Sequence, residues 1–171
     1  HMENPQKGFD ALSECLKKEG LLKIALYAKS FRQNLLEAKE FLQKNNASEE
    51  IETIRYARDQ LILSGRNDTK KSLMKYPIQL RDFYTTSEFI DLLMHVQEHD
   101  FTTEELKKLF GNSFNFLGFT FANDRINPYK ENYKERFPED IKMTDLDNWA
   151  ILEKENPSIF MSMYQFWLQK L

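Results

Sequence analysis

The sequence predicts an α/β fold that is helical over most of its length. Three short segments, near 21–27, 114–121 and 163–169, have the apolar or alternating composition of β-strands. The segments between them place apolar residues three and four positions apart, which is the spacing of amphipathic helices. Gly20 separates the first helical segment from the first strand, as expected where helices and strands alternate along a chain.

The helical spacing recurs in six segments. We expect helices at 5–19, 29–44, 48–63, 85–99, 106–110 and 144–155, with a further turn at 129–137 and a loop with a short helical turn over 64–80. Pro5 suits a first helical turn, and Thr102 and Glu105 have the spacing of a capping box. Asn156-Pro157 is expected to end the last helix.

Length, charge and cysteine content exclude several classes of protein. The chain has 171 residues, of which 41% are hydrophobic, so it can form one packed domain or one domain with an appendage. The net charge of −3 argues against a general nucleic-acid or anionic-membrane binder, so neither partner is expected. Cys15 is alone, which excludes an intrachain disulfide and favours a cytoplasmic location. No apolar run approaches 18 residues, so no membrane span is expected.

The first strand, Leu21-Leu22-Lys23-Ile24-Ala25-Leu26-Tyr27, is apolar on both faces. This pattern is typical of a central strand in a parallel sheet, which is buried on both sides. The chain has only two other expected strands, near 114–121 and 163–169, and these are too few to surround a central strand of this kind. We therefore expect this sheet to be part of a larger one.

The segment GFDALSECLKKEGLLKIALYAKS resembles the late helix and strand of class I methyltransferases. Leu16, Gly20, Leu21 and Leu22 match the helix–Leu-x-Pro-Gly-Gly-x-Leu–strand pattern, whereas Lys18 and Glu19 replace the usual proline and first glycine. Five downstream blocks extend the likeness: RDFYTTSEFIDLLMHVQEHDFTTEELKKLF, FNFLGFTF, YKERFPED, TDLDNWAILEKENPSIF and MYQFWLQK. Together they resemble the C-terminal half of a bacterial methyltransferase group that is often fused to tetratricopeptide repeats, over about residues 4–171.

The resemblance implies a particular architecture. The three strands would be the fifth, sixth and seventh of a Rossmann-like sheet, with the seventh running antiparallel beside the fifth. Residues 1–28 would form a late helix and strand, residues 29–112 a helical substrate-recognition insertion, and residues 113–171 a strand-helix-strand that completes the sheet. His1-Met2 fits either a histidine-rich turn after the fourth strand or a cloning remnant.

The resemblance also implies S-adenosylmethionine as the cofactor of the intact enzyme. This fold holds its cofactor at a Gly-rich turn after the first strand. The glycines of the chain are Gly8, Gly20, Gly65, Gly111 and Gly118, and no two are close enough to form that turn. We therefore expect no cofactor on this chain alone, and we expect a missing N-terminal methyltransferase half, or a tetratricopeptide-repeat region, as its partner.

Three functions remain open at this stage. The first is the substrate-recognition part of a methyltransferase, inactive alone, whose methyl acceptor is a small molecule or a protein. The second is a non-catalytic interaction domain derived from such an enzyme. The third is a zinc-dependent hydrolase, because His95, Glu98 and His99 have the spacing H-x-x-E-H, which on a helix would put both imidazoles on one face. A role in a substrate site or at the end of a helix is equally compatible with these residues.

Three further side chains are candidates for substrate binding. Arg81 and Tyr84 precede the histidine pair, and a guanidinium with a phenol could hold an anionic or polar group. A local pair between Arg81 and Asp82 beside core aromatics would explain them equally well. Tyr27 ends the first strand, where α/β folds bind ligands beyond the carboxyl ends of strands, although it could instead plug the edge of the sheet.

Overall fold

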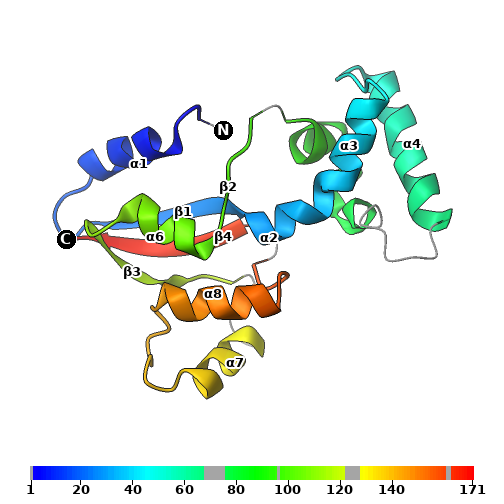
Figure 1. The fold of residues 1–171 in the computed structure, drawn as a ribbon. Coiled ribbons are helices and arrows are strands. Elements are labelled where there is room, and N and C mark those ends of the chain that lie inside the picture. The colour runs from blue at the N-terminus through cyan, green and yellow to red at the C-terminus, as the bar shows by residue number, and fades with distance from the viewer. Residues whose placement is uncertain (1, 68–75, 96, 122–127, 161–162) are drawn as a thin grey trace. The chain divides into compact units, whose positions relative to one another are not determined.

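The computed structural model describes residues 2–67, 76–95, 97–121, 128–160 and 163–171. The chain divides into two compact units (Figure 1). Residues 1–31 and 99–171 form one unit, which we call the sheet unit, and residues 32–98 form the other, the helical unit. No described helix is both long enough and apolar enough to cross a membrane.

The sheet unit is built on four strands in the order β2-β1-β4-β3. The strands are β1 (Leu21–Ala28), β2 (Asp100–Phe101), β3 (Phe114–Phe119) and β4 (Met163–Lys170). β4 runs antiparallel to both β1 and β3, so β1 and β3 are parallel to each other with β4 between them. The three strands expected from the sequence are therefore confirmed, as is an antiparallel last strand beside the first. The expectation that the first strand is buried on both faces is wrong, because Leu21, Lys23 and Ala25 on one face of β1 are exposed. The two-residue β2, parallel to β1, was not predicted because two residues carry no periodicity.

The helices of the sheet unit pack mainly on one face of this sheet. They are α1 (Pro5–Glu14), α6 (Thr103–Phe110), α7 (Pro128–Arg136) and α8 (Leu146–Glu155), and α2 (Lys29–Arg32) follows β1 into the helical unit. On β4 the even-numbered side chains Tyr164, Phe166 and Leu168 are fully buried, whereas Trp167 is exposed. Phe166 contacts Phe110 of α6, which places α6 on the buried face.

Aromatic rings fill the core between the sheet and α8. The ring of Phe119 lies 4.4 Å from that of Phe160 and 5.5 Å from that of Trp149, and Trp149 lies 4.4 Å from Tyr133. Such clusters add edge-to-face attraction to the burial of apolar area. Phe119 of β3 is therefore part of the core of the sheet unit.

The first helix is shorter than predicted. α1 ends at Glu14, not at residue 19, and a turn closed by the hydrogen bond from Gly20 N to Lys17 O leads into β1. The Lys170 ammonium group donates to the carbonyl oxygens of Ser13 and Leu16, at 2.7 and 2.9 Å. A cation that binds the last carbonyls stabilises a helix end, and this cation of β4 is 157 and 154 residues away in sequence from Ser13 and Leu16.

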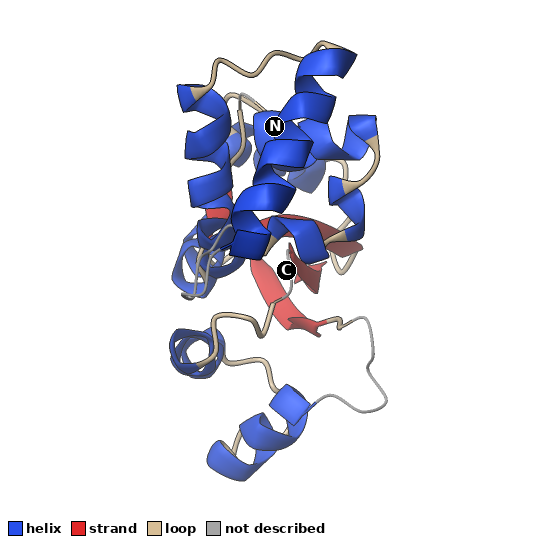
Figure 2. Ribbon diagram, turned by 90° about the vertical axis from the view of Figure 1, so that its right-hand side faces the viewer, coloured by secondary structure: helices blue, strands red, loops and turns tan. Residues whose placement is uncertain are grey.

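The helical unit is made of short elements around an apolar centre. They are η1 (Gln33–Leu35), α3 (Leu36–Lys44), α4 (Ile51–Asn67), η3 (Pro77–Gln79), η4 (Arg81–Phe83), α5 (Thr86–Phe89) and the π-helical η5 (Ile90–Met94). Figure 2 shows the helical character of most of the chain. The helical unit spans Arg32–Glu98, whereas the expected helical insertion was 29–112. The difference arises mainly from α6, which belongs to the sheet unit and packs there against α8.

The prediction of one helix over 85–99 is wrong. The helix changes to π-helical geometry at Ile90 and ends at Met94, and His95 has an extended backbone with ψ of 126°. The capping box at Thr102 and Glu105 is confirmed, with hydrogen bonds in both directions at the start of α6. α8 begins at Leu146 with Asp145 as its N-cap, one residue beyond the expected Thr144.

Asp140 ties α7 to the start of α8. Its Oδ2 accepts from the Tyr133 hydroxyl at 2.5 Å and from the backbone N–H of Asp145 at 2.8 Å. Burial acts to raise the pKa of Asp140, but the hydrogen bonds from Tyr133, Asp145 and Thr144 outweigh it and leave the pKa below its ordinary value. The same pairing and burial raise the pKa of Tyr133.

Replacing Asp140 with asparagine should destabilise the sheet unit by about 1 kcal/mol at pH 7, because two hydrogen bonds to a charged, partly exposed acceptor are weakened. A carboxylate with a lowered pKa stabilises the fold above its unfolded pKa, and this stabilisation disappears as the pH falls through the folded pKa. Urea denaturation from pH 7 to pH 3 should therefore show the two proteins converging below about pH 4. The exposed neighbour Glu139→Gln is the control and should show no such convergence.

Candidate functional site

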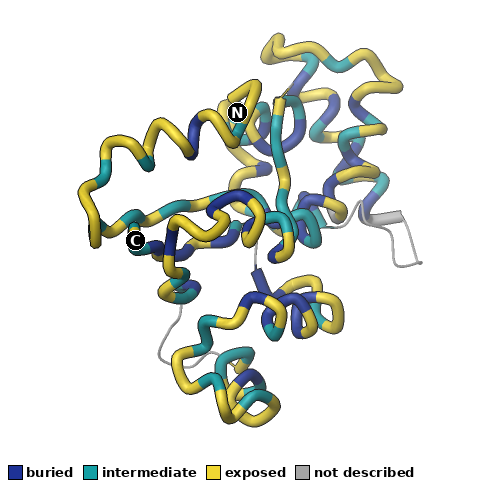
Figure 3. Tube along the Cα trace, turned by 60° about the vertical axis from the view of Figure 1, so that its left-hand side comes forward, coloured by how far each residue is buried: buried dark blue, intermediate teal, exposed yellow. Residues whose placement is uncertain are grey.

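A mostly apolar cavity of about 590 Å³ lies in the sheet unit between α1 and β1. Its walls include Phe9 and Leu12 of α1, Ile24 and Leu26 of β1, and Phe101 of β2. This volume is within the range of ligand sites in proteins. Figure 3 shows that α1 is exposed along most of its length, so this helix covers the sheet only loosely.

Two of the predicted site residues meet at one end of this cavity. Tyr27 is near the carboxyl end of β1, and His99 directly precedes β2, which pairs with β1 at Tyr27 and Ala28. His99 Nε2 lies 2.8 Å from the carbonyl oxygen of Met2, so a tautomer protonated at Nε2 donates to it. The placement agrees with the rule that α/β proteins bind ligands beyond the carboxyl ends of their strands.

A buried carboxylate lies in the sheet unit beside the residues that follow β1. Glu153 of α8 is 7% exposed and accepts from the hydroxyl groups of Ser30, at 2.8 Å, and Thr103, at 3.3 Å, and from that of Tyr164. These donors come from α2, α6 and β4, so one side chain joins four elements. Burial and the charge of Glu153 raise the pKa of Tyr164, with smaller contributions from Glu105 and Asp100.

Sequence reasoning did not single out Glu153 as a binding residue. It lies in α8 with exposed Glu155 two positions later, and no local pattern distinguishes the two. The only available signal was its position among the apolar residues of that helix, one residue after Leu152. Its partners are 11, 50 and 123 residues away, and only the tertiary structure joins them.

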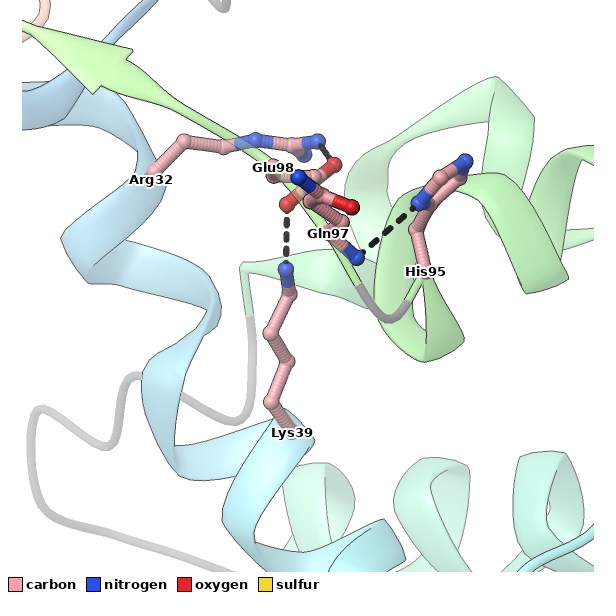
Figure 4. Close-up of polar contacts among 5 residues, drawn as sticks. All are labelled: Arg32, Lys39, His95, Gln97 and Glu98. Atoms are coloured by element: carbon pink, nitrogen blue, oxygen red, sulfur yellow. Dashed lines mark hydrogen bonds and ion pairs between the residues drawn. The ribbon is translucent and has the colours of Figure 1, made fainter. Parts of the chain in front are cut away.

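In the helical unit, Glu98 lies between two cations (Figure 4). Its carboxylate pairs with the Arg32 guanidinium through one oxygen and with the Lys39 ammonium, at 2.5 Å, through the other. The side chains of Arg32 and Glu98 are 7% and 10% exposed. Arg32 and Glu98 are also the first and last residues of the helical unit, so the pair closes the two ends of the insertion.

The arrangement expected of a zinc hydrolase is not formed. His95 follows the last helical residue, and its Nδ1 accepts from the backbone N–H of Gln97 at 3.4 Å. Since His95 and residues 97–99 lie outside helices, His95 and His99 do not form the expected pair on one helix face, and Glu98 is engaged by Arg32 and Lys39. Within the described residues no group of three or more histidine, cysteine or acidic side chains could hold a metal ion.

Arg81 and Tyr84 lie at the surface of the helical unit. Arg81 is 3.8 Å from Glu88, so its acidic neighbour is on α5 and is not the adjacent Asp82. The Tyr84 hydroxyl donates to the carbonyl oxygen of Ile78 at 2.7 Å, and its ring packs edge-on against Phe83. Both side chains are exposed.

Two known proteins are similar to this chain, one in sequence and one in structure. No family model matches the chain. It is 25% identical over 179 residues to an uncharacterized protein, syc1184_c, of Synechococcus sp. (strain ATCC 27144 / PCC 6301 / SAUG 1402/1), covering 98% of this chain and 41% of that protein. The structure of PKMT2 from Rickettsia typhi superposes with a TM-score of 0.66 at 13% identity, covering 99% of this chain and 33% of PKMT2.

The chain has a fold similar to that of part of PKMT2. The mixed α/β architecture and the partial Rossmann-like sheet expected from the sequence are thereby confirmed. At 13% identity the likeness to PKMT2 establishes the fold alone. The chain spans about two fifths and one third of the lengths of these two proteins.

Glu98→Gln should destabilise the helical unit by about 3 kcal/mol, because it removes a mostly buried negative charge that pairs with both Arg32 and Lys39. Chemical denaturation followed by circular dichroism measures the loss. Glu40→Gln is the matched control, since Glu40 forms only an exposed i,i+4 pair with Lys44, and it should change stability little. Equal stability of Glu98→Gln and the parent would show that the pair contributes no net stabilisation.

Proposed function

We propose that this chain is the substrate-recognition part, on the C-terminal side, of an S-adenosylmethionine-dependent methyltransferase, and that it is inactive alone. One observation carries the proposal: antiparallel β4 lies between the parallel strands β1 and β3. This is the order implied for the fifth, seventh and sixth strands of such a sheet. The likeness to PKMT2 over 99% of the chain supports it.

The strand-to-helix junctions support the absence of a cofactor site. β1 passes directly into α2 at Ala28 and Lys29, and β2 passes into α6 at Thr102, both without glycine. Gly111 and Gly118 have positive φ, but one follows α6 and the other lies at the bulge of β3. Among the described residues, no strand is followed by the Gly-rich turn that binds a nucleotide-like cofactor.

The acceptor that we propose is a lysine side chain of a protein. The abbreviation PKMT2 denotes a protein lysine methyltransferase. The charge near the carboxyl end of β1 supports this choice. The negative charges of Glu153, Glu105 and Asp100 all raise the pKa of Tyr164. One cation, Lys29, lies 4.0 Å from Glu105. A site with more carboxylates than cations favours an ammonium group over an anion.

The first test is calorimetric titration of the chain with S-adenosylmethionine. We expect no binding heat at micromolar concentrations, because the chain has no Gly-rich cofactor turn. PKMT2 titrated in the same buffer is the positive control. Micromolar binding to this chain would overturn the assignment of a part without a cofactor site.

The second test measures binding of lysine-containing peptides by fluorescence polarisation. Asp100→Asn should weaken binding about threefold at low salt, because it removes one exposed carboxylate from the proposed acceptor region. Glu139→Gln removes the same charge from the loop between α7 and α8 and should leave binding unchanged. Equal losses in both variants would indicate non-specific attraction to an acidic protein.

A further inference from the structure

β3 is the outer strand of the sheet on the side away from β1 (Figure 1). Among the described residues, β4 is the one strand that pairs with it. The carbonyl oxygen of Ser113 accepts from the backbone N–H of Leu171, at the end of β4. Because backbone groups alternate in direction along an antiparallel strand, those of Phe114 and Phe116 point to the opposite, open edge. They can therefore pair with a further extended segment.

A groove of about 810 Å³ lies beside the start of this open edge. Phe114, Asn115 and Phe116 line one side of it, and no described residue of β4 does, so the groove is on the unpaired side of β3. The other side is formed by residues 136–140 and 144–148, at the end of α7, in the following loop and at the start of α8. All of these residues belong to the sheet unit. A groove between a strand edge and a loop is suited to an extended peptide backbone.

The groove carries more carboxylates than cations. Its two cations are already paired, because Lys107 Nζ lies 2.7 Å from Asp147 and Arg136 Nη2 donates to Glu155 at 3.0 Å. The hydrogen bond to Asp147, with the negative charges of Asp147 and Asp145, raises the pKa of Lys107 despite a small loss of hydration. A groove with this charge favours a cationic ligand. The carboxylates that line it are Glu139, Asp140, Asp145 and Asp147.

Glu139 is the carboxylate that remains for a partner. Its side chain is exposed and forms no hydrogen bond or ion pair with another described residue. The rings of Phe116 and Phe137 are half-buried in the same groove, and the Arg136 guanidinium already lies 5.5 Å from the centre of the Phe137 ring. A guanidinium stacks on an aromatic ring and binds a carboxylate through a planar fork, whereas an ammonium group is a compact point charge. Rings and carboxylates together therefore favour arginine over lysine.

We propose that this groove binds an extended, arginine-bearing segment of a partner protein. The backbone of the segment pairs with the open edge of β3, and its arginine binds Glu139 and lies against the ring of Phe116.

The groove is distant from the proposed acceptor region along the sheet. Phe114 lies opposite Lys170 at one end of β4, whereas Tyr27 lies opposite Met163 at the other end. The bound segment is therefore a docking contact and not the methyl acceptor, and the inference does not rest on the proposed function.

A β-bulge limits the length of the paired segment. The register of β3 against β4 shifts between Phe116 and Gly118, and bulges interrupt the regular edge of a strand. Pairing is therefore confined to the three residues from Phe114 to Phe116, about 10 Å of strand. Because this ladder is short, the arginine contacts supply much of the affinity.

The experiment measures binding of a fluorescein-labelled peptide to the full chain by fluorescence polarisation. The peptide has eight residues, alternating threonine and valine, with arginine at one central position and no lysine. N-methylation of the two peptide bonds beside the arginine should weaken binding about tenfold, because the peptide then cannot complete the ladder. A peptide with lysine in place of arginine should also bind about tenfold more weakly, and its residual binding should not depend on Glu139.

Two protein variants test the arginine contact. Glu139→Gln should weaken binding of the arginine peptide about fivefold, because it removes the uncommitted carboxylate of the groove. Glu135→Gln removes the same charge from an exposed position of α7 that does not line the groove, and it should leave binding unchanged. Both side chains are exposed, so neither substitution disturbs the core.

Amide hydrogen exchange, followed by nuclear magnetic resonance, locates the bound peptide. The N–H group of Phe114 points to the open edge, so its exchange should slow about tenfold when the peptide is saturating. The N–H group of Asn115 points to β4 and is the internal reference, whose exchange should not change.

Equal binding of the parent and N-methylated peptides would overturn the proposed docking groove. Equal losses in Glu139→Gln and Glu135→Gln would overturn it as well, since binding would then follow the overall charge of the protein. Unchanged exchange at Phe114 in the saturated complex would place the peptide elsewhere. The arginine peptide has no lysine, and the assays contain no S-adenosylmethionine, so failure here leaves the proposed methyltransferase function to its own tests.

Discussion

The position of β4 between β1 and β3 is the constraint on which the sheet unit depends. Its backbone completes both ladders, and its buried side chains Tyr164, Phe166 and Leu168 form the floor against which α6 and α8 pack. Lys170, at its end, also caps α1. This eight-residue strand therefore bonds to elements from both the first and the last thirds of the chain.

Two buried carboxylates bind residues close to the points where the chain passes from one unit to the other, each within its own unit. Glu153 binds Ser30 and Thr103, which flank the points where the chain leaves and re-enters the sheet unit. Glu98 binds Arg32 across the two ends of the helical unit. Burying a charge is costly unless it is paired or hydrogen-bonded. Both groups meet that condition, so the long insertion begins and ends at defined backbone positions.

The candidate site follows from this arrangement. β1 brings Tyr27 to the carboxyl end of the sheet, and the chain returns from the insertion at His99 to form β2 on the same edge. The two side chains are 72 positions apart in the sequence, and the return of the insertion places both at one cavity. The cavity therefore lies at the edge of β1 where the returning chain forms β2.

The sequence alone determined the strands and most of the helices, because periodicity and caps are local properties. The three long strands, the capping box of α6 and the implied antiparallel neighbour of the first strand could all be predicted. Tertiary structure alone decided where helices end and which charges meet. Lys170 ends α1, a π-helical turn ends the segment before His95, and Glu98 pairs with Arg32 instead of joining a metal site. Each of these outcomes depends on groups distant in sequence or on hydrogen-bond geometry, neither of which has a periodic signature in the residues themselves.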